Sequence, residues 1–154
     1  MTREEVRTLL AQLLPEAPVR FEPPSPEAWK ALEMRFETEF PDEFVYFIDL
    51  MGEYDFPGAI YSVSDEGRTT FDAPIGFVYD QEVELFRWPP QFVPFYGIGN
   101  GDYFALNREE GRASRVYYRD HEDESMSEYS PSFAAWLEQL GDFLGAPGTT
   151  RGSV

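Results

Sequence analysis

Apolar residues recur at helical spacing over the first third of the chain and predict three helices. The first, over residues 2–14, starts at a capping box formed by Thr2 and Glu5 and ends before Pro15. The second starts at Ser25-Pro26 and the third follows Pro41 and closes at Gly52. The apolar faces of the second and third helices consist of Trp29, Leu32, Phe36 and Phe40, and of Phe44, Phe47, Ile48 and Met51.

From Gly58 onward the pattern changes to short runs of aromatic and β-branched residues separated by turn residues, which predicts strands. The candidate strands are residues 59–64, 68–71, 75–79, 83–88, 92–98, 102–107 and 114–119, with turns at 65–67 and 109–112. The connections are too short for crossover helices, so the sheet is expected to be mainly antiparallel. Ser130-Pro131 then opens a last helix with an apolar stripe made by Phe133, Trp136, Leu137, Leu140 and Leu144.

The composition indicates one acidic, globular domain without cysteine chemistry. In a chain of 154 residues, 14 Phe, 9 Tyr and 3 Trp supply the bulk of a core. The absence of Cys excludes disulfides and thiolate ligands, and no segment has the apolar length of a membrane span or a signal peptide, so we expect a cytoplasmic protein. A net charge of −17 disfavours nucleic acid and anionic lipid as direct partners and favours a basic protein.

Charged residues make up 27% of the chain and hydrophobic residues 42%. The prediction of a folded domain depends on the aromatic content alone, because large aromatic side chains supply the apolar surface that a core requires.

The glycine-rich stretch FYGIGNGDYFALN, residues 95–107, predicts a reversal between two strands rather than a phosphate-binding loop. A P-loop would need a Lys and a hydroxyl that are missing, and a dinucleotide fingerprint would need a glycine where Asp102 stands. Asn100-Gly101 between apolar runs is typical of a type I′ hairpin turn, which requires two positive φ angles. We expect the Asp102 carboxylate to accept backbone N–H groups and hold this structural turn.

Four motifs, in this order, make the chain resemble the SUKH superfamily, which groups fungal cell-wall-synthesis regulators with many bacterial immunity proteins. The first is the proline-led helix pair, with Leu32-Glu33, Phe40-Pro-Asp-Glu-Phe44 and Met51-Gly52. The others are Ile98-Gly-Asn-Gly-Asp-Tyr-Phe-Ala-Leu-Asn107, Val116-Tyr-Tyr-Arg-Asp-His-Glu122 and Ser132-Phe-Ala-Ala-Trp-Leu-Glu-Gln-Leu140. Together they span residues 23–144.

The resemblance implies an α+β fold with a curved, mostly antiparallel sheet of about six strands and helices packed on one side. We expect a single domain over residues 1–145, with an extra N-terminal helix at 2–14 and a disordered tail at 146–154. The resemblance also implies a non-enzymatic role, the binding of a protein partner. We expect no cofactor, and a monomer or weak homodimer. In bacterial relatives the partner is often a toxin, frequently a nuclease.

Catalytic and metal-binding alternatives have little support in the sequence. His121 is the only histidine, which excludes a two-His metal site within one chain, and no nucleophile motif accompanies it. A hydrolase that uses His121 is therefore a remote alternative. The carboxylates around His121 have the oxygen ligands that calcium prefers, but they lack the glycine of an EF-hand loop, so we expect at most an adventitious cation there.

The candidate partner-binding surface combines aromatic residues beside prolines with the acidic run after the last strand. Its members are Phe56, Trp88, Phe92, Asp120, Glu122, Asp123 and Glu124. Such a surface suits a partner with a basic rim and an apolar centre, and the leading hypothesis is an immunity protein that occludes the active cleft of a toxin nuclease. Two alternatives stay open: Trp88 and Phe92 fill the core instead, or the fold is a regulatory scaffold with no toxin partner.

Overall fold

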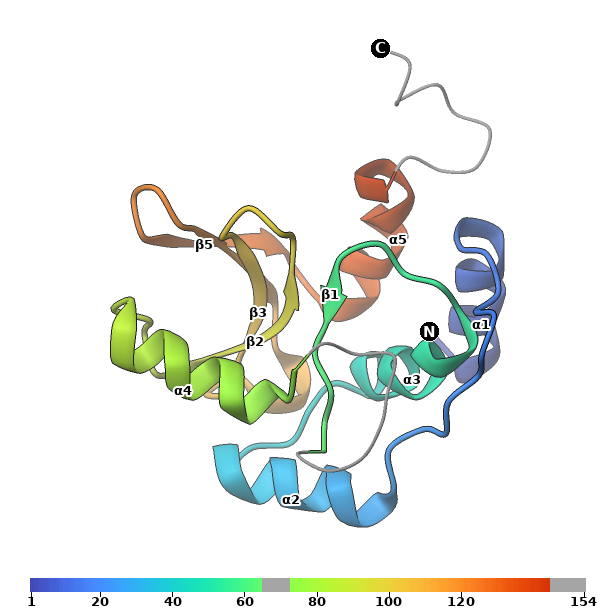
Figure 1. The fold of residues 1–154 in the computed structure, drawn as a ribbon, viewed down its shortest axis with the longest axis horizontal. Helices are drawn as coiled ribbons and strands as arrows, with labels where there is room; N and C mark the ends of the chain where they lie inside the picture. Colours follow the sequence, from blue (N-terminus) through green and yellow to red (C-terminus); the bar gives the residue numbers. More distant parts are fainter. Residues whose placement is uncertain (65–72, 145–154) are drawn as a thin grey trace.

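The computed structural model describes residues 1–64 and 73–144, which form one sheet surrounded by helices (Figure 1). The helices are α1 (Arg3–Leu13), α2 (Pro26–Phe36), α3 (Asp42–Leu50), α4 (Ile75–Leu85) and α5 (Phe133–Leu144), with short 3₁₀ turns η1 (Met51–Glu53) and η2 (Gly111–Ala113). The strands are β1 (Ala59–Ile60), β2 (Phe92–Gly97), β3 (Tyr103–Asn107), β4 (Val116–Asp120) and β5 (Ser125–Ser130). The strand expected at 68–71, the turn at 65–67 and the tail at 146–154 lie outside the described residues.

The sheet confirms the predicted α+β class and antiparallel arrangement. Its order is β1-β2-β3-β4-β5, so every strand pairs with its neighbours in the chain, and all four pairings are antiparallel. The sheet is curved and has five strands in place of about six (Figure 1). Because successive strands run in opposite directions, the β2–β3 and β4–β5 turns lie at the same end of the sheet, and the β3–β4 connection lies at the other end.

An aromatic core closes one face of the sheet against α1, α3 and α5. Phe95 on β2 and Phe104 on β3 contact Trp136 on α5, with ring centroids 5.2 and 5.4 Å apart. Phe44 on α3 contacts Phe95 and Phe133 at 5.5 and 5.3 Å in edge-to-face geometry. Such edge-to-face pairs add roughly 0.5–1.5 kcal/mol each beyond their apolar burial. The side chains on this face of the sheet therefore form the core and stabilise the fold.

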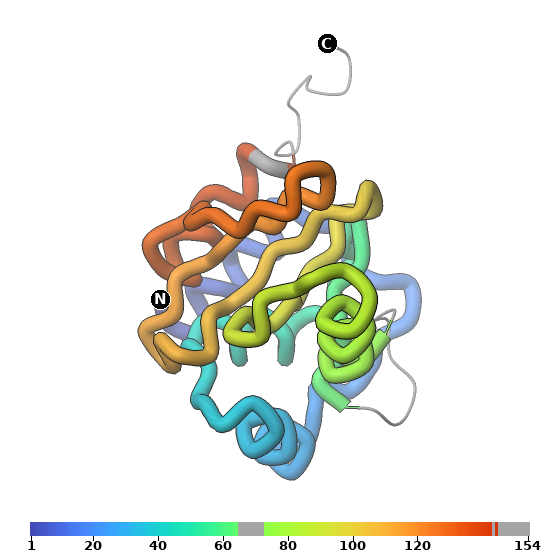
Figure 2. Tube along the Cα trace, turned by 90° about the vertical axis from the view of Figure 1, so that its left-hand side faces the viewer, coloured from blue at the N-terminus to red at the C-terminus, as the bar shows by residue number. Residues whose placement is uncertain are grey.

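Helix α4 covers part of the opposite face, and its presence corrects the two strands expected at 75–79 and 83–88. The aromatic and β-branched residues of this segment favoured strands. Its buried positions are Ile75, Gly76, Val78 and Glu82, which have helical spacing. The helical periodicity is hard to recognise in the sequence because two of these buried positions are a glycine and a glutamate. Figure 2 shows α4 lying in front of the sheet, on the side away from α5.

Several element boundaries also differ from the prediction. Helix α2 ends at Phe36 because Glu37 adopts a left-handed conformation with φ of 54°, so Phe40 lies in the connection, where it is buried. Helix α5 starts at Phe133, and the Ser132 Oγ accepts the Ala135 N–H at 3.0 Å. Strand β5 was not predicted, because its sequence SMSEYS has few strand-forming residues and most of its side chains are exposed.

The proline-rich connection between α1 and α2 is held against η1 by main-chain hydrogen bonds. The Ala17 N–H donates to the Glu53 carbonyl at 2.9 Å, and the Phe21 N–H donates to the Gly52 carbonyl at 3.1 Å. A Cβ atom at Gly52 would lie 2.3 Å from the Phe21 carbonyl oxygen. Gly52 is therefore required by the close approach of two main-chain segments; it lies within η1, because α3 ends at Leu50 and not at Gly52 as expected.

We predict that Gly52→Ala destabilises the fold by about 1–3 kcal/mol, because the added methyl group must displace main-chain atoms rather than a flexible side chain. Urea unfolding followed by circular dichroism measures this change. Thr8→Ala, at an exposed position of α1, is the control and should change stability by less than about 0.5 kcal/mol. Equal stability of Gly52→Ala and the unaltered protein would contradict the close approach.

Candidate functional site

Asp102, directly after the β2–β3 turn, binds the end of β4. Its Oδ1 accepts the His121 backbone N–H at 2.9 Å and lies 2.6 Å from the His121 Nδ1. Its Oδ2 accepts a short hydrogen bond from the Tyr118 hydroxyl. Asp102 is 7% exposed. The carboxylate thus joins the β2–β3 turn to the start of the β4–β5 turn, at the same end of the sheet.

The turn before Asp102 differs from the expected type I′ geometry. Positive φ angles occur at Gly99 (105°) and Gly101 (101°), and Asn100 is not among the residues with positive φ. The Ile98 N–H donates to the Asp102 carbonyl at 3.1 Å, so three residues form the reversal. The Asn100 Oδ1 accepts the Asp102 N–H at 2.9 Å. A Cβ atom at Gly101 would lie 2.9 Å from the His121 Cγ, so this glycine also makes room for the imidazole.

The hydrogen bonds of Asp102 shift the pKa values of all three groups. Burial raises the pKa of Asp102, but the hydrogen bonds from Tyr118 and from His121 outweigh it and lower the pKa to about 2. The hydrogen bond to Asp102 raises the pKa of His121 above its ordinary value. Burial, followed by the bond to Asp102, raises the pKa of Tyr118. Asp102 is therefore a carboxylate at neutral pH and favours a protonated imidazole.

A cavity of about 430 Å³ lies between α4 and this end of the sheet. Its lining residues come from α4, the β2–β3 turn, β3, β4 and the β4–β5 turn, and are Gln81, Glu82, Phe86, Gly101, Tyr103, Arg119, His121 and Glu124. Tyr103 and Arg119 are paired across β3 and β4, so both side chains point to the face that α4 covers. We call this space the α4 cavity.

Two buried charged groups lie in the α4 cavity. Glu82 is 9% exposed, and its Oε2 accepts the Tyr103 hydroxyl at 2.9 Å. Arg119 is 4% exposed; its Nη2 donates to the Phe86 carbonyl at 2.8 Å, and its Cζ lies 5.4 Å from the centre of the Trp88 ring. Burial raises the pKa of Glu82, while the Tyr103 hydroxyl and the Arg119 charge act in the opposite direction. Burial also raises the pKa of Tyr103, to about 12.

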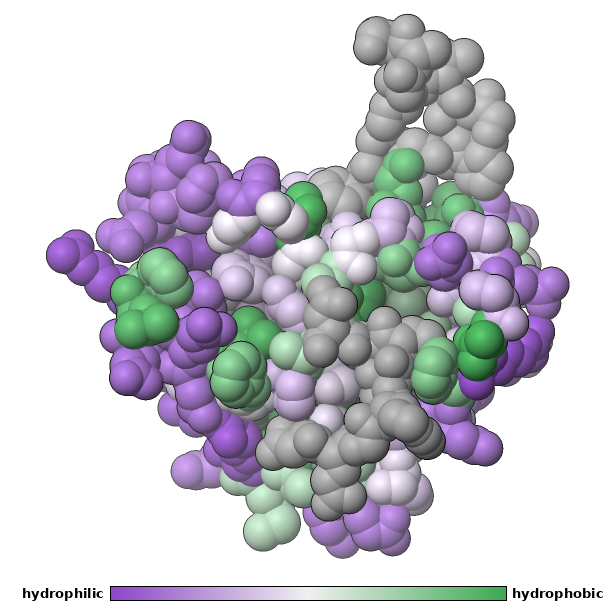
Figure 3. Space-filling model, in the orientation of Figure 1, coloured by the Kyte–Doolittle hydropathy of each residue, from purple (hydrophilic) through white to green (hydrophobic). Residues whose placement is uncertain are grey.

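The entrance of the α4 cavity is acidic on one side and apolar on the other. The β4–β5 turn carries Asp120, Glu122, Asp123 and Glu124, of which the last three are exposed. Leu85 and Phe86, at the end of α4, are 60% and 51% exposed. Figure 3 shows hydrophobic atoms over this end of α4, below the hydrophilic atoms of the β4–β5 turn. We call these two groups together the acidic–apolar rim.

The structure separates the aromatic residues that the sequence grouped into one partner-binding surface. Trp88 and Phe92 are 2% and 8% exposed and form a small core with Ala105 on the face that α4 covers. Both residues therefore fill the core, the alternative that the sequence left open. The indole N–H of Trp88 has a partner inside the protein, because its Nε1 donates to the Phe92 carbonyl at 2.8 Å. Phe56 instead packs against Phe47 and Tyr96 on the main-core side.

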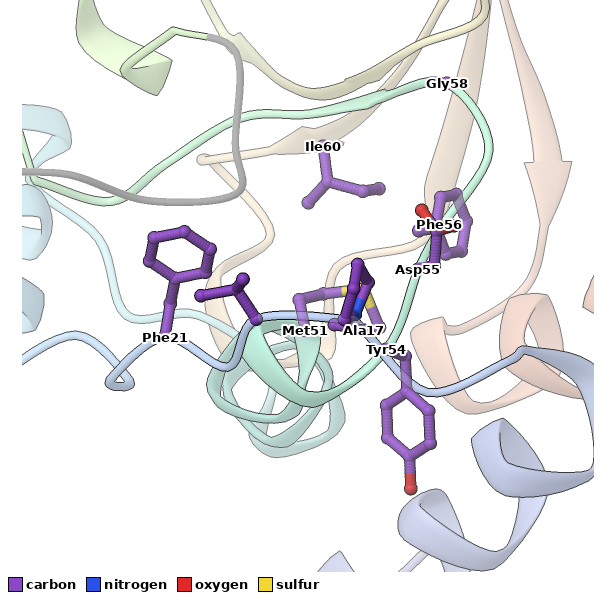
Figure 4. A pocket seen from close by; sticks show the side chains of 10 residues that line it. Ala17, Phe21, Met51, Tyr54, Asp55, Phe56, Gly58 and Ile60 are labelled. Carbon is purple, nitrogen blue, oxygen red and sulfur yellow. The ribbon is translucent and has the colours of Figure 1, made fainter.

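Phe56 lines a second cavity, of about 300 Å³, that is distinct from the α4 cavity. Its walls are the proline-rich connection and the segment after α3, and they comprise Ala17, Pro18, Val19, Phe21, Met51, Tyr54, Asp55, Phe56, Gly58 and Ile60. In Figure 4 the Tyr54 ring extends away from this space, toward the lower part of the view, whereas Ile60 projects into it from above. The lining is mainly apolar, so this cavity suits a hydrophobic group.

The site also contains a group of potential metal ligands and a potential general base. Ligand atoms of Asp102, Asp120 and His121 lie within 4.8 Å of one another. Both oxygens of Asp102 already accept hydrogen bonds, and the Asp120 Oδ1 accepts the Glu122 N–H at 2.8 Å. A carboxylate that orients an imidazole is also an arrangement used by general bases, but the lining of the α4 cavity includes no Ser, Thr or Cys side chain. The geometry is accounted for by turn hydrogen bonds.

Sequence reasoning identified the acidic turn and missed the interior of the α4 cavity. Gln81, Glu82 and Phe86 were assigned to strands or connections, and Arg119 was treated as the end of a strand. The helical spacing of Ile75, Val78 and Glu82 could have indicated that Glu82 is buried on one face of a helix. This pattern requires Gly76 to be a buried helical position as well, which its residue type does not suggest. No helix within residues 1–64 and 73–144 has the length and hydrophobicity required to cross a membrane.

Comparison with known proteins gives a family and a protein of similar fold. The SUKH_5 family model, described as SMI1-KNR4 cell-wall, matches residues 4–142. A crystal structure of a protein from Pseudomonas syringae pv. tomato is similar, with a TM-score of 0.63 and 19% sequence identity, over 89% of this chain and 96% of that chain. At that identity the likeness shows the fold alone. No curated protein matches the chain.

We predict that Asp102→Asn lowers the pKa of His121 toward its ordinary value, because the variant removes the negative charge that favours the protonated ring and leaves only one side-chain oxygen as an acceptor. His121 is the only histidine, so a single imidazole resonance in an NMR pH titration reports the change. Since folding raises this pKa, the protonated ring stabilises the fold below the unfolded pKa. That contribution is lost as the pH rises through the folded pKa. Glu122→Gln is the control and should lower the pKa less; equal pKa values in Asp102→Asn and the unaltered protein would contradict the pairing.

Proposed function

This chain belongs to the family described as SMI1-KNR4 cell-wall, and we propose that it is a non-enzymatic module that binds a basic protein. The family match covers residues 4–142 and agrees with the SUKH resemblance of the sequence motifs. The observation that carries the proposal is the acidic–apolar rim, in which the turn with exposed Glu122, Asp123 and Glu124 lies beside the end of α4 with exposed Leu85 and Phe86. The Arg87 Nη1 lies 3.7 Å from the Glu124 Oε1 where the two segments meet. Protein interfaces commonly have an apolar centre with a polar rim.

The charge of the chain supports a basic partner. A net charge of −17 attracts cationic surfaces over a range set by ionic strength, and it raises the rate of encounter. Two carboxylates of the β4–β5 turn are held by hydrogen bonds within the turn: the Asp120 Oδ1 accepts the Glu122 N–H, and the Asp123 Oδ1 accepts the Ser125 N–H at 2.9 Å. A prearranged acidic turn loses less conformational entropy on binding than a flexible one.

As the specific form of this function, we favour immunity against a toxin nuclease. A nuclease needs a cationic cleft to hold the nucleic-acid backbone. The acidic turn would enter that cleft and exclude the substrate, with Leu85 and Phe86 packing on the apolar wall beside it. The mechanism needs no catalytic group in this chain.

A regulatory scaffold is the second candidate, and a separate observation favours it. The apolar cavity beside Phe56 shares no lining residue with the α4 cavity, so two partners could be held at the same time. If the chain is a scaffold, we expect it to capture two different proteins. If it is an immunity protein, we expect it to capture one nuclease, whose activity falls in proportion to the amount of chain added.

We predict that Glu122→Gln with Glu124→Gln slows association with the natural partner, captured from the source cells, on the order of threefold per removed charge. Raising the ionic strength should slow association of the unaltered protein as well, because salt screens exposed charges. Surface plasmon resonance measures both effects. Nuclease assays on the captured protein, with and without this chain, separate immunity from scaffolding.

Glu27→Gln with Glu109→Gln is the matched control, since it removes the same charge from exposed positions outside the acidic–apolar rim. The control should retain at least most of the association rate. An association rate that is independent of salt, or an equal loss in both double variants, would contradict binding through this rim.

A further inference from the structure

Exposed apolar side chains are concentrated on helix α4. Seven large apolar side chains of the described residues are exposed, and four of them belong to α4 or to the residue that follows it, namely Phe77, Val83, Leu85 and Phe86. Phe77 and Leu85 are each 60% exposed. Single exposed apolar side chains are normal on a protein surface, but several on one element indicate an interaction surface.

Phe77, Gln81 and Leu85 form one row along α4, because residues four positions apart lie on neighbouring turns of the same side of a helix. All three side chains are exposed. In Figure 2 the outer side of α4 faces the viewer, and no other described element lies in front of it. We call this row, together with Phe86, the α4 ridge. A ridge of residues spaced by four packs into the groove between two such rows of another helix.

The carboxylates beside the α4 ridge lack cationic partners. Glu84 is exposed on α4, two helical turns after Phe77 and on the same side of the helix. Glu122 and Asp123 are exposed on the β4–β5 turn, which lies beside the end of α4. None of these three carboxylates forms an ion pair within residues 1–64 and 73–144.

Two arginines near the α4 ridge are already paired with other carboxylates. The Arg35 Nη2 lies 2.5 Å from the Asp80 Oδ1, and the Arg87 Nη1 lies 3.7 Å from the Glu124 Oε1. Helix α4 has no basic residue in its last turn, so the partial negative charge of its carboxyl end is not offset within the helix. The apolar row is therefore bordered by negative charge that a cationic partner would complement.

A second copy of this chain fits the α4 ridge poorly. A two-fold contact brings the same patch of both copies together, so the Glu84 carboxylates beside the two Phe77 side chains would repel one another. Each copy also carries a net charge of −17, which opposes close approach. The charges that disfavour self-association favour a basic partner.

We propose that the α4 ridge binds an amphipathic basic helix of the partner. The apolar stripe of that helix covers Phe77, Leu85 and Phe86, and its Lys and Arg side chains face Glu84 and the β4–β5 turn. This inference rests on the proposed function, since the helix belongs to the basic protein that the acidic–apolar rim attracts, and it adds the kind of element that docks. A helix is preferred to an extended strand because α4 presents a row of side chains, whereas strand addition requires free main-chain groups at a sheet edge.

Three acetylated, amidated peptides test the proposal, each made of a seven-residue unit written twice. The first unit, Leu-Lys-Lys-Leu-Leu-Lys-Leu, forms a basic amphipathic helix. The second, Leu-Lys-Leu-Lys-Leu-Lys-Leu, has the same composition and charge with the alternation of a strand. The third replaces every Lys of the first by Glu. Isothermal titration calorimetry with the full chain should show that the first peptide binds at least about fivefold more tightly than the second, and the third at least about tenfold more weakly than the first.

Phe77→Gln with Leu85→Gln is the informative double variant, because it removes the apolar side chains and retains a good helix former at both positions. It should weaken binding of the basic helical peptide at least about fivefold. Val19→Gln with Met34→Gln is the matched control, since these side chains are 63% and 72% exposed outside α4, and it should change the affinity less than about twofold. Two-dimensional ¹H–¹⁵N NMR of each variant without peptide verifies the fold.

The contribution of charge is measured with a second pair of variants. Glu84→Gln should weaken binding of the basic helical peptide about threefold, because it removes a carboxylate beside the α4 ridge. Glu27→Gln removes the same charge from an exposed position of α2 and should leave the affinity nearly unchanged. In the NMR spectra of the unaltered chain, the peptide should shift the amide signals of α4 more than those of α2.

Equal affinity for the helical and alternating basic peptides, or an equal loss in the two double variants, would overturn the proposal. Self-association of the unaltered chain in sedimentation experiments that Phe77→Gln with Leu85→Gln abolishes would also overturn it and assign the α4 ridge to a second copy. If the natural partner still responds to Glu122→Gln with Glu124→Gln in these cases, the proposed function stands and this inference alone fails. If the basic helical peptide binds the α4 ridge but no basic partner is captured, the proposed function fails and the docking surface stands.

Discussion

The buried carboxylate of Asp102 is the constraint on which the shape of the candidate site depends. It accepts hydrogen bonds from Tyr118 and from the main chain of His121, and so joins the β2–β3 turn to the end of β4. The acidic β4–β5 turn starts at that point. The pKa of Asp102 is lowered to about 2, so its carboxylate stays ionised throughout the pH range of a cell.

The two faces of the sheet have different roles. One face is closed by an aromatic core, in which Trp136 contacts both Phe95 and Phe104, and it provides the stability of the fold. The other face is covered only in part, by α4 and by the small core around Trp88. A partly covered face leaves space for a cavity, and strands β3 and β4 place Tyr103 and Arg119 within it.

The charges of the candidate site are of two kinds. Carboxylates on the exposed β4–β5 turn act on the surrounding solvent and are screened by salt. Glu82 is buried, and the Tyr103 hydroxyl and the charge of Arg119 offset the effect of that burial on its pKa. The exposed charges therefore depend on ionic strength more than the buried charges do.

The sequence by itself determined the elements whose apolar period is undisturbed and whose turn residues are specific. The helices at α1, α3 and α5, the antiparallel sheet and the motifs of the family were readable, because capping residues, proline and spacing are local signals. Only the tertiary structure decided the rest. Segment 75–85 becomes a helix because Gly76 and Glu82 are buried against other elements, and β5 becomes a strand because β4 pairs with it. Trp88 is buried rather than exposed for the same reason: packing between distant segments, which no local pattern encodes, determines which side chains remain at the surface.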